Sequence, residues 1–132
     1  MVLNNLAWCL VTGPADRRDP VRALKLIEEA VKQQPENAVF LNTLGVVRYR
    51  NGQYAQAVAA LEKSLAAGTG QSDAADLFFV SMCHTRLGDR DKAKDCFDRA
   101  VKWVEAQKAL PGQYVEELKA FRAEAEAALR AP

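Results

Sequence analysis

The chain has 132 residues, of which 49% are hydrophobic and 27% charged; this is the balance of one ordinary globular domain and excludes a disordered segment. Its 18 basic and 17 acidic residues are interleaved, so the sequence excludes the basic stripe of a nucleic-acid-binding protein. No run approaches the ~18 consecutive apolar residues of a membrane-spanning helix, so we expect no membrane partner either.

The chain enters a helical pattern at once, and its first predicted helix covers about residues 2–12. This start lacks the basic segment of a secretory signal. Because a complete protein seldom begins so abruptly, we expect a piece of a longer chain. The other predicted helices lie near residues 19–33, 37–50, 53–67, 73–87, 90–108 and 113–130, and no strand is needed.

A unit of two helices recurs three times, over about residues 2–35, 36–70 and 72–105. In each second helix, an alanine is followed by a large apolar residue four positions later and by a small residue three positions after that. These triplets are Ala23, Ile27 and Ala30, then Ala57, Leu61 and Ser64, then Ala93, Phe97 and Ala100. Their first members lie 34 and 36 residues apart. We expect the two extra residues in a Gly/Ser-rich loop over 68–72, and a four-residue insertion over 14–19.

Small residues at these positions predict close contact between helices. Gly45 and the alanines of the second helices have almost no side chain, so neighbouring backbones can approach each other there. Gly52 and Gly88 fall where a unit must turn from its first to its second helix. Asp19 before Pro20 is typical of a helix start. Together these features predict tightly packed antiparallel helix pairs.

The last predicted helix departs from the repeat. Its apolar stripe consists of Tyr114, Leu118, Phe121, Ala125 and Leu129. A stack of repeats leaves an apolar flank at its end, so we expect this helix, over about residues 112–130, to act as a cap. We expect Trp103 and Val104 to be the surface on which it lies.

The spaced residues described above resemble the tetratricopeptide repeat (TPR) family over about residues 2–104, and the remainder resembles the solvating helix of that family. The resemblance implies an all-α fold, a right-handed α-solenoid of antiparallel helix pairs with about seven helices, in a single domain over residues 1–132. Arg48 and His84 replace a tyrosine of the family pattern, but the small residues and turn glycines are retained. The segments around Trp8 and Gly45 also resemble repeat modules of large bacterial signalling proteins, which implies a bacterial module.

Family members bind a peptide or helix of a partner protein in a concave groove lined by their first helices, so the resemblance implies an interaction scaffold. Helix geometry separates the stripe facing the core from the opposite stripe, which would line the groove. The candidate groove residues are Asn4, Trp8, Val39, Asn42, Val46, Tyr49, Arg50, Phe78, Met82, Thr85 and Arg86. Aromatic and arginine side chains are favoured interface anchors, and the two rim arginines would suit an acidic ligand. In the alternative interpretation, Phe78 and Met82 pack on neighbouring helices and both arginines are solvated.

The helix predicted at 73–87 is apolar almost all round. Such a helix is covered on both sides, either by its own protein or by a partner. The second case supports another hypothesis for function, self-association, in which a homodimer forms through an apolar helix or end-face.

Catalytic and metal-binding patterns are absent from the sequence. Cys9, Cys83 and Cys96 cannot all pair within the chain and fit no metal-ligand spacing, so we interpret them as reduced thiols in the cytoplasm. Cys83 and His84 are neighbours on a helix and point about 100° apart, so they cannot form the hydrogen-bonded pair of a cysteine nucleophile. We therefore predict that the protein is not an enzyme and has no catalytic residue, no metal and no cofactor.

Overall fold

The computed structural model describes residues 1–68 and 73–131. The α-helices in these residues are α1 (Val2–Thr12), α2 (Pro20–Gln33), α3 (Ala38–Arg50), α4 (Tyr54–Ala67), α5 (Asp73–Arg86), α6 (Arg90–Ala106) and α7 (Gly112–Arg130). A short 3₁₀ helix, η1 (Ala15–Arg17), lies between α1 and α2. The described ranges contain no strand, and each predicted helix is confirmed with its ends within two residues.

Side-chain caps define where three helices begin. The carboxylate of Asp19 accepts a hydrogen bond from the backbone N–H of Arg22 at the start of α2. Asn37 caps α3 in the same way, and Asp89 caps α6. Each cap pairs a helix N–H that has no partner within the helix.

The turns between paired helices differ between repeats. Gly52, between α3 and α4, and Gly88, between α5 and α6, have φ angles of +77° and +85°, which favour glycine. Between α1 and α2 the predicted insertion over 14–19 contains η1, and the N–H of Asp19 donates to the carbonyl of Leu10. The extra residues predicted over 68–72 lie outside the described residues, apart from Gly68.

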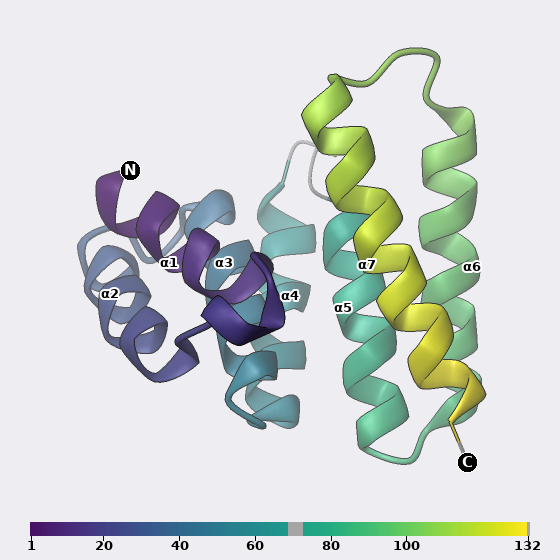
Figure 1. Cartoon of the computed structure of the whole chain (residues 1–132), viewed down its shortest axis with the longest axis horizontal. Coiled ribbons are helices and arrows are strands. Elements are labelled where there is room, and N and C mark those ends of the chain that lie inside the picture. The colour runs from purple at the N-terminus through teal and green to yellow at the C-terminus, as the bar shows by residue number, and fades with distance from the viewer. Residues whose placement is uncertain (69–72, 132) are drawn as a thin grey trace.

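The helices form a stack of antiparallel pairs, α1 with α2, α3 with α4 and α5 with α6 (Figure 1). Between pairs, α3 packs chiefly against α2, and α5 packs chiefly against α4. The chain is therefore an all-α solenoid of helix pairs, as the repeated sequence predicts. No helix in the described ranges is both long and apolar enough to cross a bilayer.

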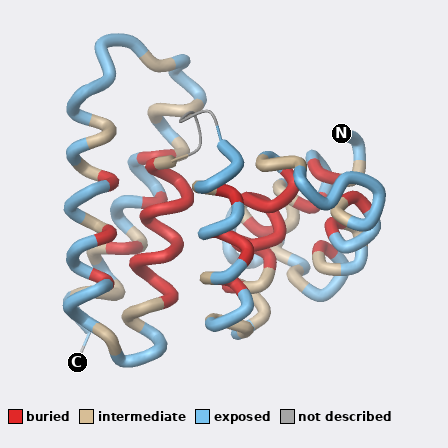
Figure 2. Tube along the Cα trace, turned by 180° about the vertical axis from the view of Figure 1, so that it is seen from behind, coloured by how far each residue is buried: buried red, intermediate tan, exposed pale blue. Residues whose placement is uncertain are grey.

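The core lies along the first helices of the repeats, and Figure 2 shows buried residues concentrated in the middle of the stack. The predicted small positions are fully buried at Ala57, Ala93 and Ala100. At Gly45 a Cβ would collide with the side chain of Leu61, so α3 and α4 are in contact there. The small residues therefore allow the close packing that the sequence predicts.

The last helix does not lie where the sequence analysis expected it. It packs chiefly against α5 and less against α6, and in Figure 1 it crosses α5 at an angle, with its C-terminal end near α6. Trp103 and Val104 of α6 are half-buried against the core and are not its main support. The aromatic residues described below explain the difference, because α5, α3 and α1 offer α7 rings and charge partners.

Candidate functional site

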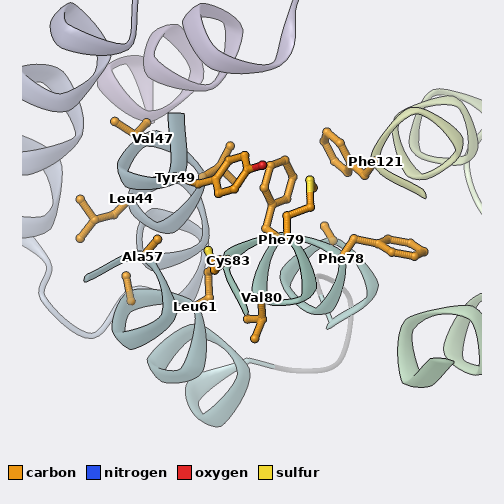
Figure 3. Packing of buried hydrophobic residues seen from close by; sticks show 14 of the residues in the cluster. Leu44, Val47, Tyr49, Ala57, Leu61, Phe78, Phe79, Val80, Cys83 and Phe121 are labelled. Atoms are coloured by element: carbon orange, nitrogen blue, oxygen red, sulfur yellow. The ribbon is translucent and has the colours of Figure 1, made fainter. Parts of the chain in front are cut away.

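We call the surface on which α7 lies the inner face and define it by Trp8 of α1, Tyr49 and Arg50 of α3, and Phe79 of α5. These side chains come from the first helix of each repeat. Figure 3 shows Tyr49, Phe79 and Phe121 of α7 gathered together. The inner face is therefore the part of the molecule where three repeats present aromatic and cationic groups to one helix.

Arg50 is the central charged residue of the inner face. Its Nη1 and Nη2 both donate to the carboxylate of Glu124 on α7, and its Nε donates to the carbonyl oxygen of Val11 at 3.0 Å. Its guanidinium also lies over the ring of Phe79, 5.5 Å from the centroid, where a cation is attracted to the π-face. One side chain thus connects α1, α5 and α7.

The aromatic contacts surround Phe121. Its ring meets Phe79 edge to face, with 4.9 Å between centroids, and meets Trp8 at 90°, with 5.9 Å between centroids. The indole N–H of Trp8 donates to Glu117 at 2.8 Å. Edge-to-face pairs contribute about 0.5–1.5 kcal/mol beyond the area they bury. Phe121 is therefore the apolar anchor of α7.

The three anchor residues of α7 lie on one stripe of the helix. Glu117, Phe121 and Glu124 are separated by four and then three positions, which brings side chains to the same helix face. Each anchor meets a different chemical group: the Trp8 N–H, the aromatic pair, and the Arg50 guanidinium. The inner face therefore contacts an acid–aromatic–acid pattern on α7.

A shallow recess of about 470 Å³ lies beside α7 at the C-terminal ends of α3 and α5. It is lined by Tyr49, Thr85, Arg86, Arg90, Glu124, Ala127, Ala128 and Ala131. Glu124 is the acidic residue of this lining and faces several arginines. Arg90 donates to the carbonyl oxygens of Leu129 and Ala131 at the end of α7. The recess is therefore positively charged overall.

Burial and neighbouring charges shift the pKa values of groups around the recess. Burial raises the pKa of the Tyr49 hydroxyl, which Arg86 hydrogen-bonds, and that bond raises the pKa of Arg86. Burial and the nearby charge of Arg50 lower the pKa of Arg18. The lowered value means that Arg18 lies where a further positive charge is unfavourable.

The structure brings some of the candidate groove residues together at α7. Trp8 and Arg50 contact α7 directly, and Tyr49, Thr85 and Arg86 line the recess. Of the rest, Asn4, Asn42, Val46, Phe78 and Met82 are buried, and Val39 is exposed at the other end of α3. Asn42 donates to the carboxyl of Asp76, which holds α3 against α5.

The sequence analysis chose the wrong one of two neighbouring phenylalanines, Phe78 and Phe79, for the groove. The sequence analysis assigned Phe78 to the groove, whereas its ring contacts Phe97 of α6 and Figure 3 shows it pointing away from Tyr49. Phe79 holds Phe121 instead. Because α5 is covered by other helices of the chain on several sides, its apolar pattern does not indicate which side faces α6 and which faces α7.

The anchors on α7 were also missed. The sequence does contain a pattern that could have identified them. Glu117, Phe121 and Glu124 form an acid–aromatic–acid stripe at helical spacing. This stripe complements the Trp8 and Arg50 already assigned to the groove. The partner of that stripe is more than 70 residues away in sequence, at Arg50. Helix periodicity alone does not pair such distant segments.

The described residues contain no group of three or more His, Cys, Asp or Glu side chains that could hold a metal ion. Cys83 and Cys96 are buried, and burial raises the pKa of the Cys83 thiol to about 12. A thiol with such a pKa is protonated at neutral pH and is a poor nucleophile.

Comparison with known protein families identifies the family of the repeats. Two tetratricopeptide repeat models match the sequence, one over residues 15–78 and the other over residues 77–106. The chain belongs to the tetratricopeptide repeat family. The matches cover η1 to α6, so the TPR pattern accounts for the helices that build most of the inner face, and α7 follows the last matched TPR helix.

The TPR fold is also found among solved structures. The chain is similar to PcrH, solved in complex with the chaperone binding region of PopD, with a TM-score of 0.71 and 24% sequence identity. The likeness covers 97% of this chain and 86% of that one. At this identity it shows a shared fold. The comparison with curated proteins gave no match.

Proposed function

We propose that this TPR chain is a protein-interaction scaffold, without catalytic activity, whose inner face binds a helical segment of a partner protein. In this proposal the three repeats and α7 act as one domain of a larger bacterial protein in the cytoplasm. The observation that carries it is that Trp8, Phe79 and Arg50 already bind one helix, α7, through specific side-chain contacts. A face that fits a helix of its own chain has the shape and chemistry to fit a similar helix from another.

Two further observations support the proposal. The recess beside α7 carries exposed Arg86, which bonds the Tyr49 hydroxyl and can offer its remaining N–H groups to an acidic ligand. The solved complex of PcrH holds a chaperone binding region of another protein, PopD, so a protein of this fold binds a segment of a partner. We extend that mode of action to this chain.

The proposed function is tested by capturing partners from lysate with matched arginine variants. Arg86→Gln removes an exposed charge at the recess, and Arg22→Gln removes an exposed charge on α2, away from the inner face. The wild type and Arg22→Gln should retain the same partner, and Arg86→Gln should retain less of it. Equal retention by both variants would place binding on another surface.

Self-association is the second candidate, and one observation favours it. The outer side of α1 leaves Val2 and Leu6 exposed, and Val21 at the start of α2 is 64% exposed. Such side chains would be covered if a second copy packed against this end of the stack. Light scattering over a range of protein concentrations tests the idea, because a mass that stays at one chain throughout would contradict it.

A further inference from the structure

The position of α7 breaks the packing rule that the other helices follow. In the repeats, the first helix of each pair rests chiefly on the second helix of the pair before it. A continuing stack would place α7 chiefly on α6, but it rests on α5 and reaches Trp8 and Arg50 across the inner face. It therefore occupies the surface that the proposed function assigns to a partner.

We infer that α7 is an internal occupant of the inner face, and that a partner's amphipathic helix carrying a similar acid–aromatic–acid stripe displaces it. The inference rests on the proposed function and names the class of partner. The first carboxylate of the stripe accepts from Trp8, the ring enters between Trp8 and Phe79, and the second carboxylate pairs with Arg50.

The contacts of α7 leave part of the inner face unmatched. Arg18 and Arg86 both lie within the electrostatic influence of Glu124, which is already bonded to Arg50. A partner with an extra carboxylate can pair with an arginine that α7 leaves without one.

The surplus of arginines over carboxylates at the inner face distinguishes a partner protein from a second copy of this chain. A second copy would offer the same α7 in exchange, with the same carboxylates at the same positions, and would leave the same arginines unmatched. A more acidic helix from another protein gains favourable charge contacts instead. The observations therefore favour a heterologous helix over an exchange of α7 between copies.

The hold of the chain on α7 can be weakened at single residues. Leu118, Phe121 and Ala125 are the buried residues of the helix, and Phe121 makes the ring contacts with Phe79 and Trp8. The short connection at residues 107–111 keeps it near the face at an effective concentration on the order of millimolar. A partner must outcompete this tethered helix, and any change that weakens α7 strengthens partner binding.

The recess gives a way to design a better ligand than α7. Ala128 lies four positions after Glu124 on the same stripe and lines the recess with Arg86. A glutamate at this position would bring a second carboxylate to the recess that Arg86 lines. A peptide with this change should therefore bind the inner face more tightly than α7 itself.

The test uses full-length chains and three fluorescent peptides with the sequence of residues 112–131. The first peptide is native, the second carries Ala128→Glu, and the third carries Phe121→Ala with Glu124→Gln. Two receptor chains have a weakened α7, one through Phe121→Ala and a milder one through Glu124→Gln. Circular dichroism checks that each chain is folded, and fluorescence anisotropy measures the dissociation constants.

The expected result is that the native peptide binds the weakened chains about tenfold more tightly than the wild type, because its internal competitor is less stable. The Ala128→Glu peptide should bind more tightly still, and the peptide lacking both anchors should lose most of its affinity. Adding Arg86→Gln to a weakened chain should remove the advantage of the Ala128→Glu peptide.

Three outcomes would overturn the inference. Equal affinity for wild-type and weakened chains would make α7 a permanent part of the fold, and reduced partner capture by Arg86→Gln would then keep the interaction scaffold but place its binding site at the recess beside α7. Absence of peptide binding to folded, weakened chains would show that the face does not accept a helix in trans. A weakened chain that forms dimers in light scattering would make the occupant a second copy.

Discussion

The guanidinium of Arg50 donates two hydrogen bonds to the carboxylate of Glu124, which joins the end of α3 to the middle of α7. The Arg50 side chain is 9% exposed and that of Glu124 is 32% exposed. A bidentate ion pair of this kind fixes the relative orientation of the two groups as well as their distance. Partial burial reduces its screening by salt. It is therefore the main polar link between α7 and the repeats.

Glu124→Gln should destabilise the chain by about 1–3 kcal/mol, because Arg50 stays in place without its charge partner and near other arginines. Urea denaturation followed by circular dichroism measures the change. Glu126→Gln is the matched control, since Glu126 forms only exposed pairs with Arg122 and Arg130 and should change stability by less than about 0.5 kcal/mol. Equal effects would mean that the Arg50 link contributes no more than a surface pair.

Asp76 should make stability fall as the pH rises. Burial raises its pKa from 3.8 to about 7, so the folded chain keeps a proton that the unfolded chain loses. Its stabilising contribution is complete below about pH 4 and is lost as the pH rises through about 7. The full loss is on the order of a few kcal/mol, at about 1.4 kcal/mol per pKa unit.

The hydrogen bonds around Asp76 oppose the effect of burial. The Ser64 hydroxyl donates to Oδ2 of Asp76 at 2.8 Å, and the Asn42 amide donates to Oδ1. Both bonds lower the pKa of Asp76, but burial outweighs them. Asp76→Asn preserves a donor and an acceptor at this position. The stability advantage of this variant should grow between about pH 4 and about pH 7, and an advantage that stays constant would contradict the raised pKa.

Gly45→Ala should destabilise the chain by about 1–3 kcal/mol, because its methyl group would collide with Leu61 and push α3 from α4. Gly112→Ala is the control, since nothing lies near a Cβ at the start of α7. That change should be neutral or slightly stabilising. A thermal melt of each variant distinguishes them, and an undisturbed melt for Gly45→Ala would show that the two helices are not in contact at this point.

Thiol labelling should separate the three cysteines by burial. Cys9 is exposed, whereas Cys83 is fully buried and Cys96 is 8% exposed. With Ellman's reagent, one thiol per chain should react quickly in the folded protein and all three should react in denaturant. A Cys9→Ser chain should then lack the fast reaction. Fast reaction of three thiols under native conditions would be incompatible with this packing.

The helices and their pairing could be predicted from the sequence because the information is local. The triplet that contains Ala57 and Leu61 recurs in phase, and Gly52 and Gly88 mark the turns that the structure contains. Such short-range patterns determine where helices begin, end and meet their immediate neighbours. The all-α solenoid follows from them.

The inner face could be predicted only in part, for a physical reason. Trp8 and Arg50 stand out as large groups opposite the core stripe, and both contact α7. In α5 the apolar residues surround the helix, so the choice between Phe78 and Phe79 depends on neighbours that periodicity does not reveal. The docking of α7 depends on contacts between distant residues, which local patterns do not specify.

The most direct test of a helix-binding inner face is a nuclear magnetic resonance titration of ¹⁵N-labelled chain with the Ala128→Glu peptide. The chain has two tryptophans, so Trp103→Phe leaves the Trp8 indole N–H as a single reporter beside Glu117. The account predicts that this resonance and the α7 amides shift together on binding, while the amides of α2 stay in place. Shifts confined to α2 and α4, with the Trp8 indole unmoved, would contradict it.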